Sequence, residues 1–354
     1  MSNKKPLKVV ELFAGVGGFR LGLEGWKGLS PLSFYKEPIS QNFKVVWSNQ
    51  HEPGSQVQYA NQVYRHHFSK IKGSQHSDVL IEKVKAKDIP KHDMLVGGFP
   101  CQDFSVGSLN KRAGGLKGKK GVLWYEIQRI LKHNKKQGFP TKYVLLENVD
   151  RLLKCPVNIK GADFTKILQQ LNSLEYAVEW KVINAGDYNM PQRRRRVFIL
   201  CYQKGTDIYE KIISDNYLWL TQKGVLASAF KSKEYNNKRD YLLKHCKNYI
   251  QDRMRIDKSK FDDKTYYNEY MKHKKIPSLF DNSGLMINGN IITAKHVADK
   301  KENKNPLRNF LESNDSKIGE EFLVSKEEYL EKWQETKNSK KILRKSEDQD
   351  FEYK

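Results

Sequence analysis

The feature that most constrains the fold is an alternation of short apolar runs with stretches of helical periodicity over the first two hundred residues. The apolar runs have the length and the β-branched content of strands, and they read LKVVELFA, FKVVWSNQ, HDMLVGGFP, KYVLLENV and RRVFILCY. Helix-period stretches such as GVLWYEIQRILKHNK and DFTKILQQLNSL lie between them. Strands that are apolar throughout and separated by helices predict an α/β fold, in which a mostly parallel sheet is covered on both faces.

Glycine-rich or polar motifs follow strands of this predicted sheet. FAGVGG comes after the first strand, FPCQ after a later one, and ENV after the next. Ligands of open parallel sheets bind beyond the carboxyl ends of the strands, near the point where the strand order reverses. Motifs at equivalent strand ends therefore predict one functional site at this edge of the sheet.

The chain is strongly basic. Its 354 residues carry a formal net charge of +23, and 38% of them are hydrophobic. This hydrophobic content is that of a globular protein, and the excess of Lys and Arg predicts a polyanionic partner, with nucleic acid first. A basic surface without a ligand, as a lysine-rich proteome produces, is the alternative.

The cysteines are scattered, and they lack the spacing of a zinc site or of a disulfide framework; they are Cys101, Cys155, Cys201 and Cys246. We expect a reducing, intracellular environment and no bound metal. The amino-terminal stretch MSNKKPLKVVELF has no signal-peptide pattern, and no apolar run approaches the roughly 18 residues of a membrane helix. These features predict a soluble, cytoplasmic protein with no membrane partner.

The character of the sequence changes near residue 205. The stretch that follows mixes basic residues with tyrosines and shows no strand–helix alternation. We expect a first domain over 1–205 and a second, smaller, basic domain over 206–354. Within the second, GLMINGNIITAKHV predicts a hairpin around Asn288 and Gly289. A solvated appendage is the alternative for this region.

The thiol of Cys101 is a candidate nucleophile. It follows Pro100 at a predicted strand end and precedes SVGSLNKRAGGLKGKKG, a stretch rich in lysine and glycine that contains no acid. Positive surroundings favour the thiolate, so the arrangement suits a nucleophile that acts on a polyanion. Core filler is the alternative role for the cysteine, and a solvated surface excursion is the alternative for the stretch after it.

A carboxyl group and a run of arginines lie at neighbouring predicted strand ends. Glu147 ends the apolar run of YVLLENV, and a carboxyl in a poorly solvated pocket there can donate a proton at neutral pH. An acid that interacts with a helix dipole is the alternative. PQRRRRVFIL places arginines before a strand, and alternation sends Arg194 and Arg196 to one face. They can orient a carboxylate, thiolate or phosphate, or they can simply form a cationic surface.

Taken in order, ELFAGVGGFR, GGFPCQDFS, LLENV and QRRRRVFI resemble the main motifs of the DNA cytosine-5 methyltransferase family, over roughly residues 8 to 200. The resemblance implies the Rossmann-like fold of S-adenosylmethionine-dependent methyltransferases and the flipping of a cytosine out of double-stranded DNA. It implies that Cys101 attacks C6 of this base, that Glu147 binds and protonates N3, and that C5 then takes the methyl group. Arg194 and Arg196 would orient the base and the acid.

The same resemblance assigns the contacts of the cofactor and of DNA. S-adenosylmethionine would be bound by Phe13, Gly15, Val16, Gly18, Gln50, His51, Asp88, Ile89, Pro100 and Leu123. Gln50 and His51 stand where the family commonly has an acid and an aromatic residue, so the usual carboxylate is absent there, and Glu52 is a nearby substitute. The basic loop would close over DNA, with contacts from Gln102, Ser105, Lys111 and Arg112.

The last motifs of the family are not found in this sequence. The family normally carries R-E-x-x-R-L-Q-like and G-N-A/S-V-P-like motifs there, and NGNIITAKHV lacks the V-P of the second. We therefore expect 206–354 to be a partial target-recognition domain and a second polypeptide to complete the enzyme. A degenerate copy that binds DNA without turnover and an RNA cytosine methyltransferase are the alternatives. Such an enzyme would be bacterial or phage-encoded and associated with the nucleoid.

Overall fold

The computed structural model describes residues 5–25, 42–99, 123–156, 159–248, 250–251, 278–299, 319, 324–334, 344–345 and 350–351. Pro100, Cys101 and the predicted DNA contacts Gln102, Ser105, Lys111 and Arg112 lie outside the described residues. By its internal contacts the chain divides into two compact units, Met1–Asn305 and Pro306–Lys354.

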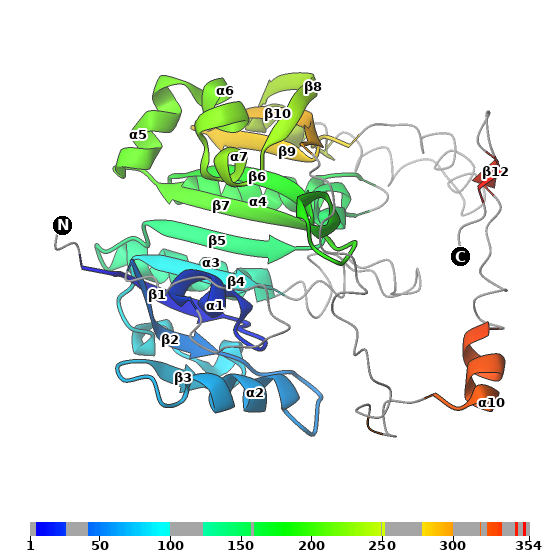
Figure 1. Ribbon diagram of the computed structural model, residues 1–354. Helices are drawn as coiled ribbons and strands as arrows, with labels where there is room; N and C mark the ends of the chain where they lie inside the picture. Colours follow the sequence, from blue (N-terminus) through cyan, green and yellow to red (C-terminus); the bar gives the residue numbers. More distant parts are fainter. Residues whose placement is uncertain are drawn as a thin grey trace. The chain divides into compact units, whose positions relative to one another are not determined.

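The first unit is built on a mixed sheet of ten strands in the order β3-β2-β1-β4-β5-β7-β6-β9-β10-β8 (Figure 1). The first five strands of this order are parallel to one another: β1 (Leu7–Leu12), β2 (Phe43–Asn49), β3 (Gln75–Ser77), β4 (Met94–Gly98) and β5 (Tyr143–Asn148). The chain moves outward from β1 through β2 to β3 and then crosses to β4, so the strand order reverses between β1 and β4. The predicted α/β fold with a parallel core is confirmed.

The other half of the sheet is antiparallel. It consists of β7 (Arg195–Gln203), β6 (Tyr176–Asn184), β9 (Ser283–Ile287), β10 (Asn290–Ala298) and β8 (Ser232–Leu242). β7 lies between β5 and β6 and is antiparallel to both, because only the short connection 185–194 joins β6 to β7. The expectation of a parallel arrangement for the run RRVFILCY was therefore wrong, and β6 was not predicted.

The segment after residue 205 extends the same sheet. β9 pairs with β6, β10 pairs with β9, and β8 pairs with β10. The turn between β9 and β10 has φ angles of 49° at Asn288 and 75° at Gly289, so the predicted Asn-Gly hairpin is confirmed. The expected boundary near residue 205 does not coincide with the division by contacts, because this pairing keeps the chain in the first unit up to Asn305.

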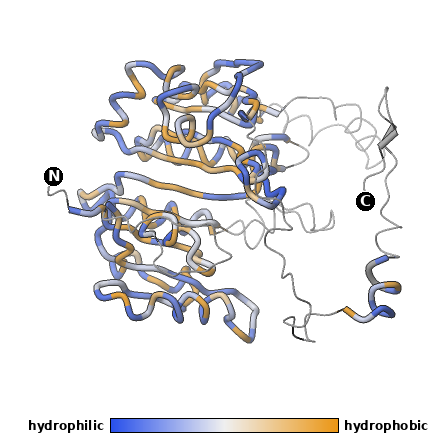
Figure 2. Tube along the Cα trace, in the orientation of Figure 1, coloured by the Kyte–Doolittle hydropathy of each residue, from blue (hydrophilic) through white to orange (hydrophobic). Residues whose placement is uncertain are grey.

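Helices cover both faces of the sheet. They are α1 (Gly18–Glu24), α2 (Tyr59–Phe68), α3 (Leu123–Lys136), α4 (Ala162–Ser173), α5 (Asp207–Ser214), α6 (Asn216–Leu218) and α7 (Val225–Ala229). Val10 belongs to the core cluster that includes side chains of α3 and α4, whereas its neighbour Val9 packs with Phe19 of α1. Neighbouring strand residues point to opposite faces, so strands buried on both faces are mostly hydrophobic, as Figure 2 shows for the central strands.

The second unit contributes few described residues. The short helix α10 (Lys326–Glu328) continues as a π-helical turn over Tyr329–Gln334, and its first turn is capped by the Ser325 hydroxyl, which accepts from the Glu328 N–H at 3.1 Å. β11 (Arg344–Lys345) pairs antiparallel with β12 (Asp350–Phe351). Across the described parts of both units, every helix is too short or too polar to cross a membrane.

Candidate functional site

A cavity of about 330 Å³ lies at the carboxyl ends of β1, β2 and β4. Its walls are Phe13, Gly15, Asn49, Gln50, His51, Glu52, Pro53, Ala60, Leu80, Ile81, Glu82, Gly98 and Leu123. Apolar side chains from several elements face a few amide, imidazole and carboxylate groups. A cavity of this size, largely apolar with a few polar groups, is typical of a small-molecule site.

Five of the predicted cofactor residues line this cavity: Phe13, Gly15, Gln50, His51 and Leu123. Val16 and Gly18 are not in the wall, although they belong to the same turn. The side chain of Val16 is exposed, and Gly18 is the first residue of α1.

Asp88 and Ile89 do not line the cavity. Asp88 ends the 3-10 turn η2 (Ala86–Asp88), and Ile89 is buried in the main core. The wall is formed instead by the preceding turn η1 (Ile81–Lys83), through Ile81 and Glu82. The wall residues that were not predicted are Asn49, Pro53, Ala60, Leu80, Ile81, Glu82 and Gly98.

The turn after β1 has an unusual backbone. Phe13, Gly15 and Gly17 have positive φ angles of 53°, 56° and 95°. A Cβ atom at Gly17 would lie 2.3 Å from the ring of Phe68, so α2 packs too closely for any other residue. A non-glycine residue such as Phe13 rarely adopts such a φ, and residues held in this way are often found at binding sites.

A buried polar network supports this turn. Arg20, 1% exposed, donates through Nε to Glu24 at 2.8 Å and through Nη1 to the Tyr64 hydroxyl at 3.2 Å. The Tyr64 hydroxyl donates in turn to Glu11 Oε2 at 2.9 Å. Burial raises the pKa of Glu11 to about 7, although the hydrogen bonds from Tyr64 and the Arg20 N–H favour the carboxylate. The network joins β1, α1 and α2, the elements next to the turn that carries Phe13 and Gly15 of the cavity wall.

The side chains that follow β2 are fixed by backbone partners. The Gly15 N–H donates to Gln50 Oε1 at 2.7 Å, which leaves the NH₂ group of this amide as a donor. His51 Nδ1 lies 2.7 Å from the Asp78 carbonyl oxygen and donates to it, because a carbonyl can only accept. The Glu52 N–H donates to Gln58 Oε1 at 2.7 Å, which holds the loop that carries the Glu52 carboxylate.

Glu147 and Arg196 form an ion pair at the adjoining strand ends. Arg196 Nε lies 2.6 Å from Glu147 Oε1, and each side chain is about one-fifth exposed, at 22% and 23%. Arg196 Nη1 also donates to the Arg195 carbonyl oxygen at 2.8 Å, so the guanidinium is held at two points. Arg194 lies before β7, where its carbonyl oxygen accepts from the Ala185 N–H at 3.0 Å. The structure thus brings Arg196 to the predicted acid, whereas no contact between Arg194 and this acid is found among the described residues.

Gly97 and Gly98 join the cavity to this ion pair. A Cβ atom at Gly97 would lie 2.7 Å from the Leu12 carbonyl oxygen, and one at Gly98 would lie 3.1 Å from Glu147 Oε2. Gly98 also lines the cavity, so the cavity and the carboxylate meet at this residue. Asn148 Nδ2 donates to the Phe99 carbonyl oxygen at 3.1 Å, which fixes the end of the segment that leads to Cys101.

The cysteines among the described residues are buried. Cys201 is fully buried, and its burial raises the pKa of its thiol strongly; burial raises the pKa of Cys246 to about 12. Thiols in such surroundings are protonated and unreactive at neutral pH. In the part of the chain that the structure covers, no group of three or more His, Cys, Asp or Glu side chains is arranged to hold a metal ion.

Comparison with known proteins finds methyltransferases as relatives of this chain. The family model for C-5 cytosine-specific DNA methylase matches residues 7–352. The chain is 39% identical to the Type II methyltransferase M.Sau3AI of Staphylococcus aureus over 97% of this chain and 73% of that protein. It is 34% identical to M.DsaV of Dactylococcopsis salina and 33% identical to M.HhaI of Haemophilus parahaemolyticus, in each case over 57% of this chain. The matched region spans about half of these two relatives, 47% and 51%. A crystal structure of the Dnmt2 methyltransferase of S. pombe has a TM-score of 0.40 and 18% identity, over 57% of this chain and 51% of that chain.

Proposed function

The chain belongs to the C-5 cytosine-specific DNA methylase family, and we propose that it transfers the methyl group of S-adenosylmethionine to C5 of a cytosine in double-stranded DNA. The observation that carries this proposal is the junction at Gly98. A cavity of the size of a small-molecule site and a carboxylate held by Arg196 meet there, three residues before Cys101.

The residues of the cavity fit this cofactor. Phe13, Ile81 and Leu123 offer apolar surface to an adenine ring and a methionine chain. The free NH₂ group of Gln50 can donate to a ribose oxygen, and the carboxylate of Glu52 can accept from a ribose hydroxyl. When bound, S-adenosylmethionine supplies an electrophilic methyl group.

In the proposed mechanism, the cytosine first leaves the DNA stack, because its C5 and C6 atoms cannot be reached within a duplex. The Cys101 thiolate attacks C6 and forms a carbon–sulfur bond, while the Glu147 carboxyl binds N3 and transfers a proton to it. The resulting enamine makes C5 nucleophilic, and C5 takes the methyl group. Loss of the C5 proton to a base then restores the double bond, the bond from C6 to sulfur breaks, and N3 returns its proton to Glu147.

Arg196 has a positioning role in this mechanism. Its Nη1 is held by the Arg195 carbonyl oxygen and its Nε holds Oε1 of Glu147, so Oε2 is left to contact the base. A guanidinium held by two hydrogen bonds offers a defined geometry that an ammonium group would not. The net charge of +23 supports DNA as the substrate, since duplex DNA is a polyanion.

We further propose that a second polypeptide completes the enzyme and that 206–354 forms part of the target-recognition domain. The Type II methyltransferases among the relatives support a role as the modification enzyme of a restriction–modification system.

The test is a methyl-transfer assay with tritiated S-adenosylmethionine and mixed-sequence DNA. The chain is assayed alone and together with the product of the adjacent open reading frame, and activity only in the mixture would support the two-polypeptide form. Cys101→Ser should abolish transfer and the covalent adduct with DNA that contains 5-fluorocytosine, whereas the matched control Cys201→Ala should retain both. DNA binding without transfer in every mixture would favour the non-catalytic alternative, and transfer to RNA alone would favour the RNA methyltransferase.

A further inference from the structure

A second cavity, of about 230 Å³, lies beside the catalytic strand ends. It is bordered by the 3-10 turn η4 (Asp150–Lys154), which follows β5, by Arg195 at the start of β7, and by Lys295 of β10. Asp150 lies three residues after Glu147, and Arg195 directly precedes Arg196. The cavity is therefore built on the same two strand ends as the proposed catalytic ion pair.

The cationic side chains of this cavity outnumber its free carboxylates. Arg195, Lys154 and Lys295 line it together with Asp150 and Asp281. Asp281 is already neutralised by Arg239, whose Nη2 lies 2.8 Å from the carboxylate. Asp150 is paired with Arg195, whose Nη2 lies 3.1 Å from its carboxylate.

The two lysines of the cavity have no carboxylate of their own. Within the described residues, neither Lys154 nor Lys295 has an acidic side chain within ion-pair distance. The cavity thus carries net positive charge. The residues that supply this charge lie far apart in the sequence.

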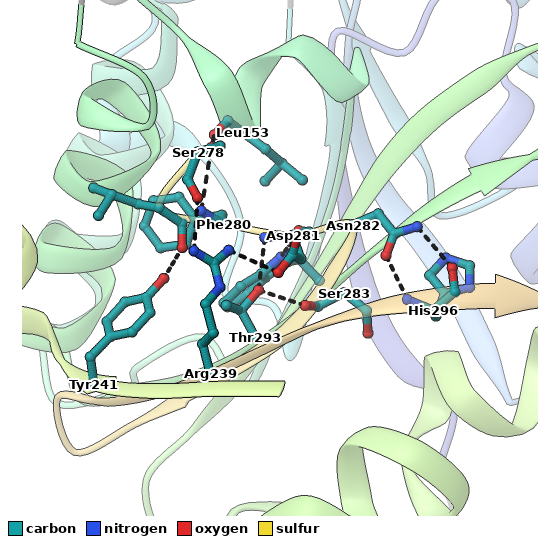
Figure 3. Close-up of polar contacts among 12 residues, drawn as sticks. Leu153, Arg239, Tyr241, Ser278, Phe280, Asp281, Asn282, Ser283, Thr293 and His296 are labelled. Carbon is teal, nitrogen blue, oxygen red and sulfur yellow. Dashed lines mark hydrogen bonds and ion pairs between the residues drawn. The ribbon is translucent and has the colours of Figure 1, made fainter. Parts of the chain in front are cut away.

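The frame of this cavity is fixed by hydrogen bonds, which Figure 3 shows. The Ser278 hydroxyl donates to the Leu153 carbonyl oxygen at 2.9 Å, and Arg239 Nη1 donates to the Ser278 carbonyl oxygen at 3.1 Å. These contacts tie the segment before β9 to η4 on one side and to β8 on the other.

The position of Lys295 is fixed in the same way. Asn282 Nδ2 donates to the His296 carbonyl oxygen at 3.0 Å, and the His296 N–H donates to Asn282 Oδ1 at 2.7 Å, as Figure 3 shows. The backbone next to Lys295 is therefore held before any ligand binds.

We propose that this cavity binds one backbone phosphate of the DNA substrate, next to the cytosine that is flipped out. The proposal rests on the proposed function, and it deepens that function by naming DNA contacts at Lys154 and Lys295, outside the family motifs. Lys154, Arg195 and Lys295 are the phosphate-binding groups. They position the duplex without reading its sequence, because a phosphate group carries no base identity.

The test is the salt dependence of DNA binding, measured by fluorescence anisotropy with a labelled duplex. Each phosphate contact contributes about −0.9 to the slope of log K against log salt. Because the cavity holds one phosphate, the double variant Lys154→Ala/Lys295→Ala should make the slope less negative by about 0.9, and each single variant should do so by less. Each variant should weaken binding several-fold at low salt. Lys91→Ala is the matched control, because Lys91 lines a separate cavity at the opposite ends of the strands, with Lys8 and Lys142.

The results separate this proposal from the proposed function. The phosphate site would be overturned if the salt slopes of the single and double variants matched that of Lys91→Ala, while their thermal melts matched that of the wild type. Methyl transfer by the wild-type enzyme, alone or in the two-polypeptide mixture, is measured in parallel. Transfer with unchanged slopes would reject the phosphate site alone. A wild-type enzyme that binds no DNA, either alone or in the two-polypeptide mixture, would reject both proposals.

Discussion

The two glycines before the Phe-Pro-Cys motif make different contacts, so the same substitution should have different effects at each. A methyl group at Gly97 would lie 2.7 Å from the backbone oxygen of Leu12, and one at Gly98 would lie 3.1 Å from the side-chain Oε2 of Glu147. We predict that Gly97→Ala destabilises the fold and that Gly98→Ala mainly lowers activity.

The magnitudes follow from the distances. An ordinary carbon–oxygen contact begins near 3.4 Å, so the Gly97 methyl is 0.7 Å too close to a main-chain atom that cannot rotate away. β1 and β4 must separate, and overpacking of this kind costs about 1–3 kcal/mol. The Gly98 methyl is only 0.3 Å too close, and the carboxylate it meets can shift. A misplacement of 1 Å can cost about 100-fold in rate, so this shift should lower kcat roughly four- to ten-fold.

The measurement is urea denaturation of both variants, together with single-turnover methyl transfer. Replacing Gly by Ala also lowers the entropy of the unfolded chain, but this effect is common to both variants and cancels in their difference. Cofactor binding is measured separately by calorimetry, because Gly98 lines the cavity. Equal unfolding free energies for the two variants would refute the close approach of β1 to β4. An unchanged kcat for Gly98→Ala would refute the role of a precisely placed Glu147.

Other predictions concern the cofactor site and the hairpin. Gln50→Glu should bind S-adenosylmethionine several-fold more tightly in calorimetry, because one carboxylate oxygen can accept from the Gly15 N–H and the other from a ribose hydroxyl; weaker binding would contradict this. Burial lowers the pKa of His296 to about 4, and its ring contacts Val182 and Ser232. The unfolded chain therefore takes up this proton first, and the free energy of unfolding should fall as the pH drops from about 6.5 towards 4, by at most about 3 kcal/mol. Urea denaturation of the wild type and of His296→Gln should differ in this slope, and equal slopes would exclude His296 as the cause.

The sequence predicted the strands whose apolar character is continuous. It missed the strands whose apolar character is interrupted or absent, which are β3, β6 and β8, and β6 shows why. Glu179 and Lys181 interrupt this strand, yet each is only 2% exposed. Glu179 accepts from the Tyr202 hydroxyl at 2.5 Å, and Lys181 Nζ donates to the Ser232 hydroxyl at 2.9 Å. These partners are 23 and 51 residues away. No local pattern could therefore show that the two charges would be buried with partners.

The cofactor site, too, could be predicted from the sequence only in part. Residues directly after β1 and β2 line the cavity as expected, because the end of a strand fixes their position. Asp88 and Ile89 do not line the cavity. Two 3-10 turns follow β3 in succession, and only the first of them reaches the cavity. Which of two consecutive turns faces a ligand depends on packing against α3, where Arg129 Nη2 donates to the carbonyl oxygens of Ile81 and Val84.

The antiparallel direction of β7 explains why the arginine run is where it is. A parallel β7 would have begun at the opposite edge of the sheet, far from the carboxyl end of β5. Because β7 is reversed, its first residues lie beside Glu147 and Asp150. Alternation along the strand then directs Arg196 to Glu147 and Arg195 to Asp150. One reversed strand therefore supplies neighbouring arginines to the proposed catalytic acid and to the proposed phosphate site, and a change in its register would disrupt both at once.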